Sequence, residues 1–355
     1  MILRADRLGD LILTTPLVRA LADAHWQVSV VCRRDFLPVL ENNPHVAAAH
    51  GLEDLCPRWP RGWWQLSRHL RRARYDAILI PQAAPPALAW ASACSGIPLR
   101  IVLYGGKWAS LTLHQRVPAN DAHSSEHYAR QVLSLAGMLG ISAENARPEI
   151  FLRESELAAM RQNLRDRFGE PGRPLVVLHA GGGHLRPGQR SSACNLPVDE
   201  YARLTGLLLE ATDCRVVITG NQSEAAQLEP AWAAWRNHPR CWYAVGAFAL
   251  REFAALLQQA DLTIVGSTGP LHLASAVGAT TLSPFCSALG DNAATWGNQG
   301  GIGHVVERSP ATCPRRLGQS WACGDFQGEI TASHLFERAN GILKNVTPRA
   351  DHLPL

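Results

Sequence analysis

The stretch from Asp261 to Phe285 constrains the fold of this 355-residue chain more than any other. It has a β-rich run over Asp261–Val265, a helical run over Pro270–Val277 and a second β-rich run over Thr280–Phe285. Two strands joined through a helix run parallel in one sheet, and parallel sheets carry helices on both faces. The stretch therefore predicts an α/β fold built on a parallel sheet.

The same alternation of strand and helix continues along the chain in two halves. In the first half, Leu17–Ala24 and Tyr128–Leu139 have helical spacing of their apolar residues. A cluster of helix breakers over 169–174 then precedes a new strand at Leu175–His179. The further strands expected are Val28–Val31, Ala77–Ile80, Arg100–Leu103 and Val216–Thr219, and the further helices are Leu157–Phe168 and Leu250–Gln259.

We therefore expect two doubly wound (Rossmann-like) domains, residues 1–170 and 171–355, which face each other across a cleft. The last helix could pack back on the first of them. Ligands of open α/β sheets bind beyond the carboxyl ends of the strands, so that edge of each sheet is the expected place for a site.

The composition is that of a globular protein, with 46% hydrophobic and 18% charged residues. The net charge of +4 is too weak to indicate nucleic acid as a partner, and no apolar run is long enough to span a membrane. The chain starts directly with a strand-like segment, and the cysteines, of which there are nine, are scattered. We therefore expect a cytoplasmic, reduced protein, with Cys313 and Cys323 near one another in a loop but not binding zinc.

The segment after Asp261–Val265 has the chemistry of an anion site. Thr268 and Gly269 suit a tight loop and an N-cap, and Pro270 suits the first helical position. The N–H groups and positive dipole end of such a helix favour phosphate, to which His272 in the same first turn could donate. On local residues alone, an ordinary strand-to-helix turn with a capping threonine is slightly favoured.

Gly9 and Asp10 follow the first strand and open a helix. Asp10 would be stabilised there by the helix dipole and could simply cap the helix. In the functional interpretation it faces the cleft and accepts a proton from a hydroxyl group, while Gly9 lets a substrate approach the backbone closely.

A glycine-rich exit follows the first strand of the second half, and at Gly181 and Gly182 it suits close approach of a phosphate or a sugar. It is neither a Walker loop nor a dinucleotide fingerprint, because no Gly-Lys-Ser/Thr follows and the next helix starts many residues later. Arg186 and Arg190 could neutralise a diphosphate, although solvated loop charges are the simpler interpretation. Glu224 could bind ribose hydroxyls or merely favour the start of a helix.

A basic run with interspersed tryptophans lies in the first half. It suits an anionic, amphiphilic partner, and a solvated basic helix with aromatic residues packed beneath it is an equally good interpretation. Arg100 and Lys107 would add charge to the same half. The run comprises Arg58, Arg61, Arg68, Arg71, Arg72 and Arg74, with Trp59, Trp63 and Trp64.

Together these segments resemble glycosyltransferase family 9, the ADP-heptose:lipopolysaccharide heptosyltransferases. The similarity rests on Arg-Leu-Gly-Asp with Thr-Thr-Pro-Leu over 7–17, the strand exit at 179–182, the turn over 219–224 and Gly-Ser-Thr-Gly-Pro-Leu-His over 266–272. The loop with Cys313 and Cys323 resembles the family's C-terminal cysteine loop. The segments occur in the family's order over most of the chain.

The resemblance implies the GT-B architecture and inverting transfer without a metal or other cofactor. Asp10 would be the general base, Thr268, Gly269 and His272 would hold the diphosphate, and Glu224 would bind the ribose. The chain departs from the family at Cys194–Pro197, where members often carry a Lys or Arg beside Trp-Pro, so that Arg190 or Arg186 would have to substitute. Taken with the local residues, the expected donor site comprises Ser267, Thr268, Gly269, Pro270, His272, Glu224, Gly181, Gly182 and Arg190, and the expected acceptor site comprises Gly9, Arg61, Arg68 and Arg100.

The leading interpretation is a cytoplasmic enzyme that transfers a heptose from ADP-heptose to a hydroxyl of a lipopolysaccharide-type acceptor. Its partners would be the ADP-sugar and an anionic glycolipid, with peripheral association at the inner face of the membrane as a further expectation. Two alternatives stay open: the same family with another sugar donor or a natural-product acceptor, and a non-catalytic nucleotide-sugar-binding protein.

Overall fold

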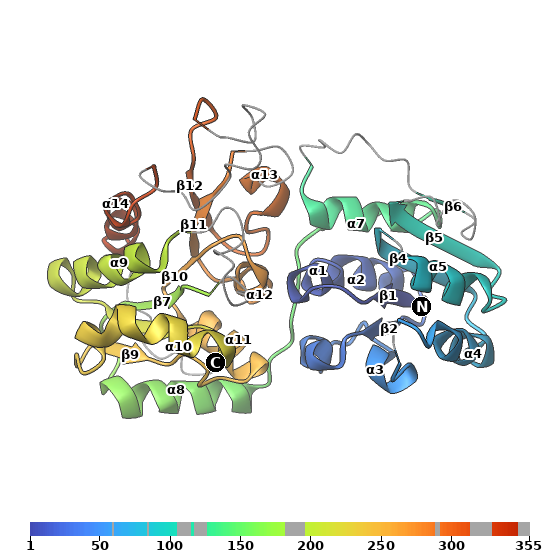
Figure 1. Cartoon of the computed structure of the whole chain (residues 1–355), viewed down its shortest axis with the longest axis horizontal. Helices are drawn as coiled ribbons and strands as arrows, with labels where there is room; N and C mark the ends of the chain where they lie inside the picture. Colours follow the sequence, from blue (N-terminus) through green and yellow to red (C-terminus); the bar gives the residue numbers. More distant parts are fainter. Residues whose placement is uncertain are drawn as a thin grey trace. The chain divides into compact units, whose positions relative to one another are not determined.

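The computed structural model describes residues 1–58, 60–83, 85–104, 115–116, 126–181, 196–287, 292–312 and 329–346. The chain forms two compact units, Met1–Phe151 and Leu152–Leu355 (Figure 1). In the described residues, each unit is built around its own parallel sheet of six strands. The expectation of two doubly wound α/β units is confirmed.

The first sheet has the strand order β3-β2-β1-β4-β5-β6, and all neighbouring strands are parallel. The order reverses between β1 and β4, so the carboxyl ends of these two strands form the switch point at which such sheets bind ligands. The strands are β1 Ile2–Arg4, β2 Ser29–Cys32, β3 Ala48–Gly51, β4 Ala77–Ala83, β5 Leu99–Tyr104 and β6 Gln115–Arg116.

Helices cover both faces of the first sheet. On one face α2 packs against α7, and on the other α3, α4 and α5 bury leucines and alanines against strand residues such as Leu3 and Ile78. Figure 1 shows α7 on one side of the sheet and α3 and α4 on the other. The helices are α1 Leu8–Ile12, α2 Thr15–Asp23, α3 Leu52–Leu55, α4 Trp63–Ala73, α5 Pro86–Ala93 and α7 Tyr128–Gly137, with a 3-10 helix η1 at Arg34–Val39.

The second sheet has the order β12-β11-β10-β7-β8-β9, which is the same topology in its own strand sequence. Its switch point therefore lies between β7 and β10. These two strands are fully buried, as expected when helices cover both faces of a parallel sheet. The strands are β7 Leu175–His179, β8 Arg215–Thr219, β9 Cys241–Tyr243, β10 Leu262–Val265, β11 Thr281–Phe285 and β12 Gly303–Glu307.

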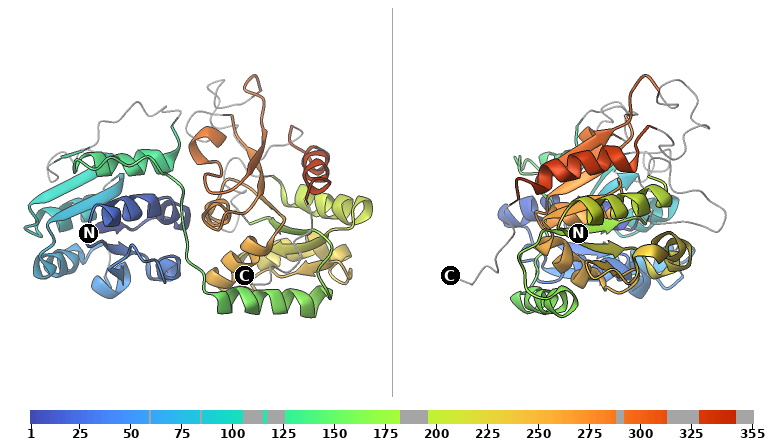
Figure 2. Two further views of the ribbon diagram at one scale, coloured as in Figure 1. Left: turned by 180° about the vertical axis from the view of Figure 1, so that it is seen from behind. Right: turned by 90° about the vertical axis from the view of Figure 1, so that its left-hand side faces the viewer.

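The core of the second unit lies under α9 and α14, which pack side by side against β10, β11 and the buried Trp232 (Figure 2). Helices α8 and α11 pack together elsewhere in the unit. The helices are α8 Glu154–Phe168, α9 Val198–Ala211, α10 Ala225–Leu228, α11 Leu250–Gln259, α12 Gly269–Ala276, α13 Ala293–Trp296 and α14 Ala332–Leu343, with 3-10 helices η2 Gln222–Glu224 and η3 Glu229–Trp235.

One detail of the expected domain organisation differs in the structure. The units divide before α8 and not at residue 170, because Glu156 on α8 forms a bidentate ion pair with Arg251 on α11, with N–O distances of 2.6 and 2.7 Å. The last described helix, α14, belongs to the core of the second unit, in which it buries its apolar side chains.

No helix in the described parts of the chain combines the length and the apolar character that a membrane span requires. The thiols of Cys32 and Cys214 are free and buried, and Cys286 is buried as well. Burial raises the pKa of the Cys32 thiol to about 12, so this cysteine behaves as a small apolar side chain.

Candidate functional site

Polar residues gather at the switch point of the first sheet. Arg4 ends β1, Asp6 follows it in the loop, and Asp10 lies in α1. Gln82 projects from the neighbouring strand β4, and Tyr128 begins α7. Residues far apart in the sequence thus converge beyond the ends of β1 and β4.

Arg4 holds both carboxylates from the interior, with 1% of its side chain exposed. Its Nε lies 2.8 Å from Asp6 Oδ1, and its Nη2 lies 3.0 Å from Asp10 Oδ1. Nη2 also donates a 3.1 Å hydrogen bond to the Tyr128 hydroxyl, which donates in turn to the Pro81 carbonyl at 3.2 Å. One buried guanidinium therefore fixes two carboxylates.

The charges of this cluster follow from burial and pairing. Burial acts to lower the pKa of Arg4, but its neighbours together raise it above the ordinary value, so the guanidinium stays charged. Burial raises the pKa of the Asp6 carboxyl to about 6, against the attraction of Arg4 and with added repulsion from Asp10. Burial likewise raises the pKa of Tyr128 to about 12, so its hydroxyl keeps its proton.

Asp10 does not cap α1. Arg7 occupies the N-cap position, and the Asp10 side chain points to Arg4 instead. Arg4 approaches only Oδ1, and no hydrogen bond to Oδ2 occurs within the described residues. The side chain is 14% exposed, which leaves one carboxylate oxygen for a proton from a substrate hydroxyl. Gly9, expected to let a substrate approach the backbone closely, is buried within α1.

Sequence reasoning missed Arg4, Asp6, Gln82 and Tyr128. The signal that could have revealed them is Arg4 itself, because an arginine inside an otherwise apolar strand must find buried partners. The nearest acidic residues in the chain, Asp6 and Asp10, are those partners.

The second switch point brings together three segments that the sequence singled out. His179 pairs in register with Val265 on one side and with Thr219 on the other. The glycine-rich exit after β7, the turn after β8 and the start of α12 after β10 therefore lie at one edge of the sheet.

His179 is fixed in its neutral form at this edge. Burial lowers its pKa to about 4. The Thr219 hydroxyl donates to the Leu178 carbonyl at 3.2 Å, so it can only accept from His179 Nδ1, at 3.0 Å. This bond assigns the proton to Nδ1 and leaves Nε2 as an acceptor.

The Glu224 side chain lies against the glycine-rich exit that follows β7. A Cβ on Gly181 would stand 2.3 Å from Glu224 Oε2 and 3.0 Å from His179 Nε2, so the backbone approaches both groups as only glycine allows. Glu224 Oε2 also accepts the Asn221 backbone N–H at 3.0 Å. The interpretation of Glu224 as a turn-stabilising residue is therefore correct in part, and the same carboxylate faces the ligand edge.

The start of α12 is accessible. Helix α12 begins at Gly269, one residue earlier than expected, and Thr268 is its N-cap without a side-chain capping bond. The residues from Ser267 to Pro270 are half-buried. His272 is 5% exposed, with its ring centroid 6.0 Å from that of Trp296. Within the first turn, Pro270 has no N–H and the Leu271 N–H donates to the Thr268 carbonyl at 3.0 Å, which leaves the Gly269 N–H and the positive end of the helix to bind an anion.

Several predicted residues lie outside the described residues. These are Gly182, Arg186 and Arg190 of the donor site, Cys194 at the family departure, Trp59 and Lys107, and Cys313 and Cys323.

The basic run forms an exposed surface on α4 and the loop before it, and all six arginines from Arg58 to Arg74 are exposed. Trp63 packs toward the core beside Trp90, whereas Trp64 is 53% exposed. Trp63 is therefore packed beneath the helix, as one interpretation has it, and a role of the exposed Trp64 in binding a partner stays a prediction.

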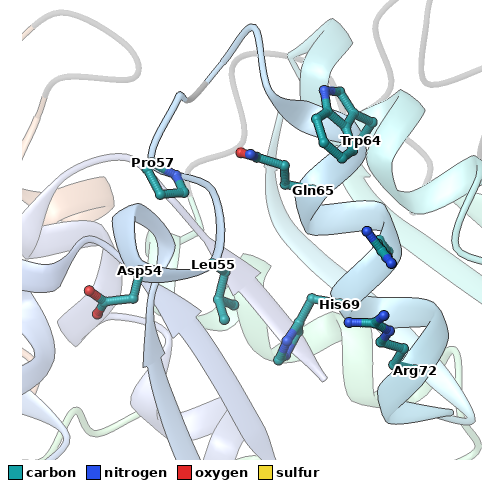
Figure 3. Close-up of a pocket in the computed structure, with 8 residues that line it drawn as sticks. Asp54, Leu55, Pro57, Trp64, Gln65, His69 and Arg72 are labelled. Carbon is teal, nitrogen blue, oxygen red and sulfur yellow. The ribbon is translucent and has the colours of Figure 1, made fainter.

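A pocket of about 350 Å³ opens between α3 and α4 within this surface (Figure 3). Two of its lining atoms, Gln65 Oε1 and His69 Nε2, are buried without a hydrogen-bond partner among the described residues. Burial, with the neighbouring His50, lowers the pKa of His69, which favours its neutral form. Figure 3 shows Trp64 and Arg72 on α4 facing Leu55 and Pro57. Its lining residues are Asp54, Leu55, Pro57, Trp64, Gln65, Arg68, His69 and Arg72.

The predicted acceptor residues do not all come together. Helix α4 leads from the carboxyl end of β3 back to the amino end of β4, so Arg61 lies near the same sheet edge as Asp10. Arg68 lies further along and lines the pocket. Arg100 pairs in register with Ile78 near the start of β5, at the opposite edge, and donates to the Ile97 carbonyl at 3.1 Å. The structure does not bring Arg100 to Asp10.

The two doubly wound units are those of the GT-B architecture. A sequence profile described as glycosyltransferase family 9 (heptosyltransferase) matches residues 63–316, more than half of the chain. The chain therefore belongs to glycosyltransferase family 9, and it is an enzyme of that class.

Solved structures agree on the fold. A family 9 glycosyltransferase of Veillonella parvula has a TM-score of 0.76 at 16% identity and covers 97% of each chain. The Escherichia coli ADP-heptose lipopolysaccharide heptosyltransferase II has a TM-score of 0.70 at 19% identity over 97% of this chain and 98% of its own. A presumed glycosyltransferase of Haemophilus influenzae is 28% identical over 217 residues, which is 59% of either chain.

Proposed function

We propose that this enzyme is an inverting, metal-independent transferase that moves a heptose from ADP-heptose to a hydroxyl of a lipopolysaccharide-type acceptor. The second unit binds the donor, and the first unit supplies the base and binds the acceptor. One observation carries the proposal: the switch point of the first sheet presents Asp10 on a buried arginine, and that of the second presents a helix N-terminus beside an acidic side chain.

The donor site is assembled from the edge of the second sheet. Thr268 and Gly269 bind the diphosphate through a hydroxyl and backbone N–H groups, with Ser267, Pro270 and His272 completing the helix start. Glu224 accepts hydrogen bonds from the ribose, and Gly181 keeps the backbone close, with Gly182 and Arg190 as further proposed members. An Escherichia coli heptosyltransferase of this fold has been solved with ADP and with ADP-2-deoxy-2-fluoro heptose, which supports the choice of donor.

The reaction is a single displacement. Asp10 takes the proton from the acceptor hydroxyl as that oxygen attacks the anomeric carbon of the sugar. The bond between this carbon and the diphosphate oxygen breaks on the opposite side, so the configuration inverts. The electron pair leaves with ADP, whose growing charge is stabilised at the N-terminus of α12.

A donor panel tests this function. Purified protein is incubated with ADP-heptose, other ADP-sugars and UDP-sugars, with and without a heptose-deficient lipopolysaccharide acceptor, and both nucleotide release and acceptor mass are measured. Acceptor-dependent release with ADP-heptose and a matching mass increase are expected. Tight ADP binding without turnover on any acceptor would instead identify a nucleotide-sugar-binding protein.

Chelation is expected to leave the rate of transfer unchanged. Divalent cations bind carboxylate oxygens, but Asp6 and Asp10 both pair with Arg4, and the described residues include no group of three or more His, Cys, Asp or Glu side chains that could hold a metal ion. The measurement is the initial rate in excess EDTA, followed by addition of Mg²⁺ or Mn²⁺. Loss of turnover in EDTA that either ion restores would contradict metal independence.

The α3–α4 pocket is proposed to bind an anionic group of the acceptor. Arg68 and Arg72 lie one turn apart on α4 and supply charge, and Trp64 and Leu55 supply apolar surface. Gln65 and His69 offer buried polar atoms that lack partners. Such a mixed surface suits an anionic, amphiphilic molecule.

Replacing Arg68 and Arg72 together with glutamine is expected to raise the acceptor KM and to weaken its dependence on salt, because two attractive charges are removed. ADP affinity is expected to stay unchanged. The matched control is the double variant Arg71→Gln, Arg74→Gln, which removes the same charge from the same helix outside the pocket. If the two double variants have equal effects, acceptor binding depends on the overall positive charge of this surface and not on the pocket.

A further inference from the structure

We propose that Asp6 is a positioning residue for the transfer reaction: by sharing the Arg4 guanidinium with Asp10, it sets how firmly Arg4 holds Asp10 and how readily Asp10 accepts a proton. The inference rests on the proposed function, because it takes Asp10 as the base.

The geometry gives Arg4 two competing anions. Asp6 and Asp10 contact different nitrogens of the same guanidinium, at 2.8 and 3.0 Å. The guanidinium is buried, and its Nη1 has no hydrogen-bond partner in the described residues. One positive charge is therefore shared between two carboxylates. Because the guanidinium is buried, water screens these electrostatic interactions weakly.

The position of Asp6 allows its carboxyl group to exchange a proton with solvent. Its side chain is 34% exposed, so a proton can reach it from solvent. The Gln82 amide, oriented to suit its neighbours, donates to both Asp6 oxygens at 3.0 and 3.2 Å. These two hydrogen bonds favour this amide orientation over the opposite one, in which the Gln82 amide oxygen accepts a 3.3 Å hydrogen bond from the Ala5 N–H.

The charged and titratable groups that interact with Asp6 from the described elements are Arg4 on β1, Asp10 on α1 and Tyr128 on α7. Arg4 and Tyr128 keep their protons across neutral pH. Because the pKa of Asp6 is raised to about 6, Asp6 is the group expected to change charge between weakly acidic and neutral pH.

The sign of the effect follows from charge. When Asp6 is protonated, Arg4 serves Asp10 alone, and the stronger pairing makes Asp10 a poorer base. When Asp6 is ionised, it competes with Asp10 for Arg4 and repels the Asp10 carboxylate, so Asp10 is held less firmly and is a better base toward the acceptor hydroxyl. The rate of transfer should therefore rise as the pH rises through the pKa of Asp6.

The first experiment compares pH profiles of kcat/KM for the wild type, Asp6→Asn and Asp6→Glu, with the exposed Asp23→Asn on α2 as the control. The wild type is expected to show an acid limb centred near the pKa of Asp6. Asp6→Asn should lose this limb and have a plateau lower by about 3- to 10-fold, the scale of a modest change in base strength. Asp6→Glu should restore the limb, and Asp23→Asn should match the wild type.

The second experiment does not depend on activity. In the free protein with ¹³C-labelled aspartate, the Asp10 carboxyl resonance is followed against pH, with Asp10→Asn used for its assignment. A second inflection in the Asp10 curve at the pKa of Asp6, absent in Asp6→Asn, is expected. An Asp10 resonance that ignores Asp6, or an acid limb retained in Asp6→Asn, would overturn the inference while the proposed function stands. Failure of transfer with every donor would overturn the function, and the Asp10 curve would still decide whether Asp6 controls Asp10.

Discussion

Asp10→Asn is expected to lower kcat by at least about 100-fold, the scale of a positioned general base. Asparagine has the same shape, and its amide oxygen can still face Arg4 Nη2, but it cannot take a proton from the acceptor hydroxyl. Arg4 retains Asp6 as a charged partner, so the variant should fold and bind ADP as the wild type does. The measurements are kcat with saturating substrates, ADP affinity by calorimetry and the thermal midpoint.

The same variant separates the catalytic role of Asp10 from a structural one. If Asp10 only neutralised Arg4, the variant would lose stability, because a buried charge would lose a partner, and would keep a near-normal kcat. Asp23→Asn serves as the matched control, since Asp23 is an exposed aspartate at the end of α2. A near-normal kcat in Asp10→Asn would remove Asp10 from the role of base.

Gly269→Val is expected to weaken ADP binding by roughly 100-fold, equivalent to the loss of one or two charge-assisted hydrogen bonds. Gly269 is the first residue of α12 and is half-buried at the ligand edge of the second sheet. A β-branched side chain there stands where a phosphate must approach the backbone N–H groups. His272→Ala should cost less, about 1–3 kcal/mol, the range for one hydrogen bond to a charged group.

Gly341→Val is the matched control for this substitution. Gly341 lies on the exposed side of α14, and a Cβ there meets no atom within 4 Å. Gly341→Val therefore makes the same substitution of a helical glycine without touching the donor site. Calorimetric titration with ADP compares the variants, and wild-type affinity in Gly269→Val would place the nucleotide elsewhere.

Helices and strands could be predicted where the pattern of apolar residues is typical of only one of the two elements. Leu175–His179 and Leu250–Gln259 have the predicted bounds, since a continuous apolar run after a cluster of breakers marks the first and helical spacing of apolar residues marks the second. The strand β3 was not predicted, because Ala48–Gly51 is short and built of small residues and a histidine. Backbone pairing with β2 stabilises this segment as a strand, although its residues have a low strand propensity.

The site could be predicted only where its residues are local in sequence. Asp10, the glycine-rich exit and the start of α12 each follow a strand, so the position alone marked them. The pairing of Arg4 with two carboxylates, the contact of Gln82 with Asp6 and the opposite placement of Arg100 depend on strand order, which one sequence does not determine. The tautomer of His179 depends in the same way on its pairing with Thr219.

The most direct test of the account is the anomeric configuration of the product. Purified protein, ADP-heptose and a heptose-deficient lipopolysaccharide acceptor are combined in EDTA, and the new glycosidic linkage is examined by NMR. The account predicts one heptose added per acceptor, with the configuration at the anomeric carbon opposite to that in the donor. A product that retains the donor configuration, or release of ADP without any new linkage, would contradict it.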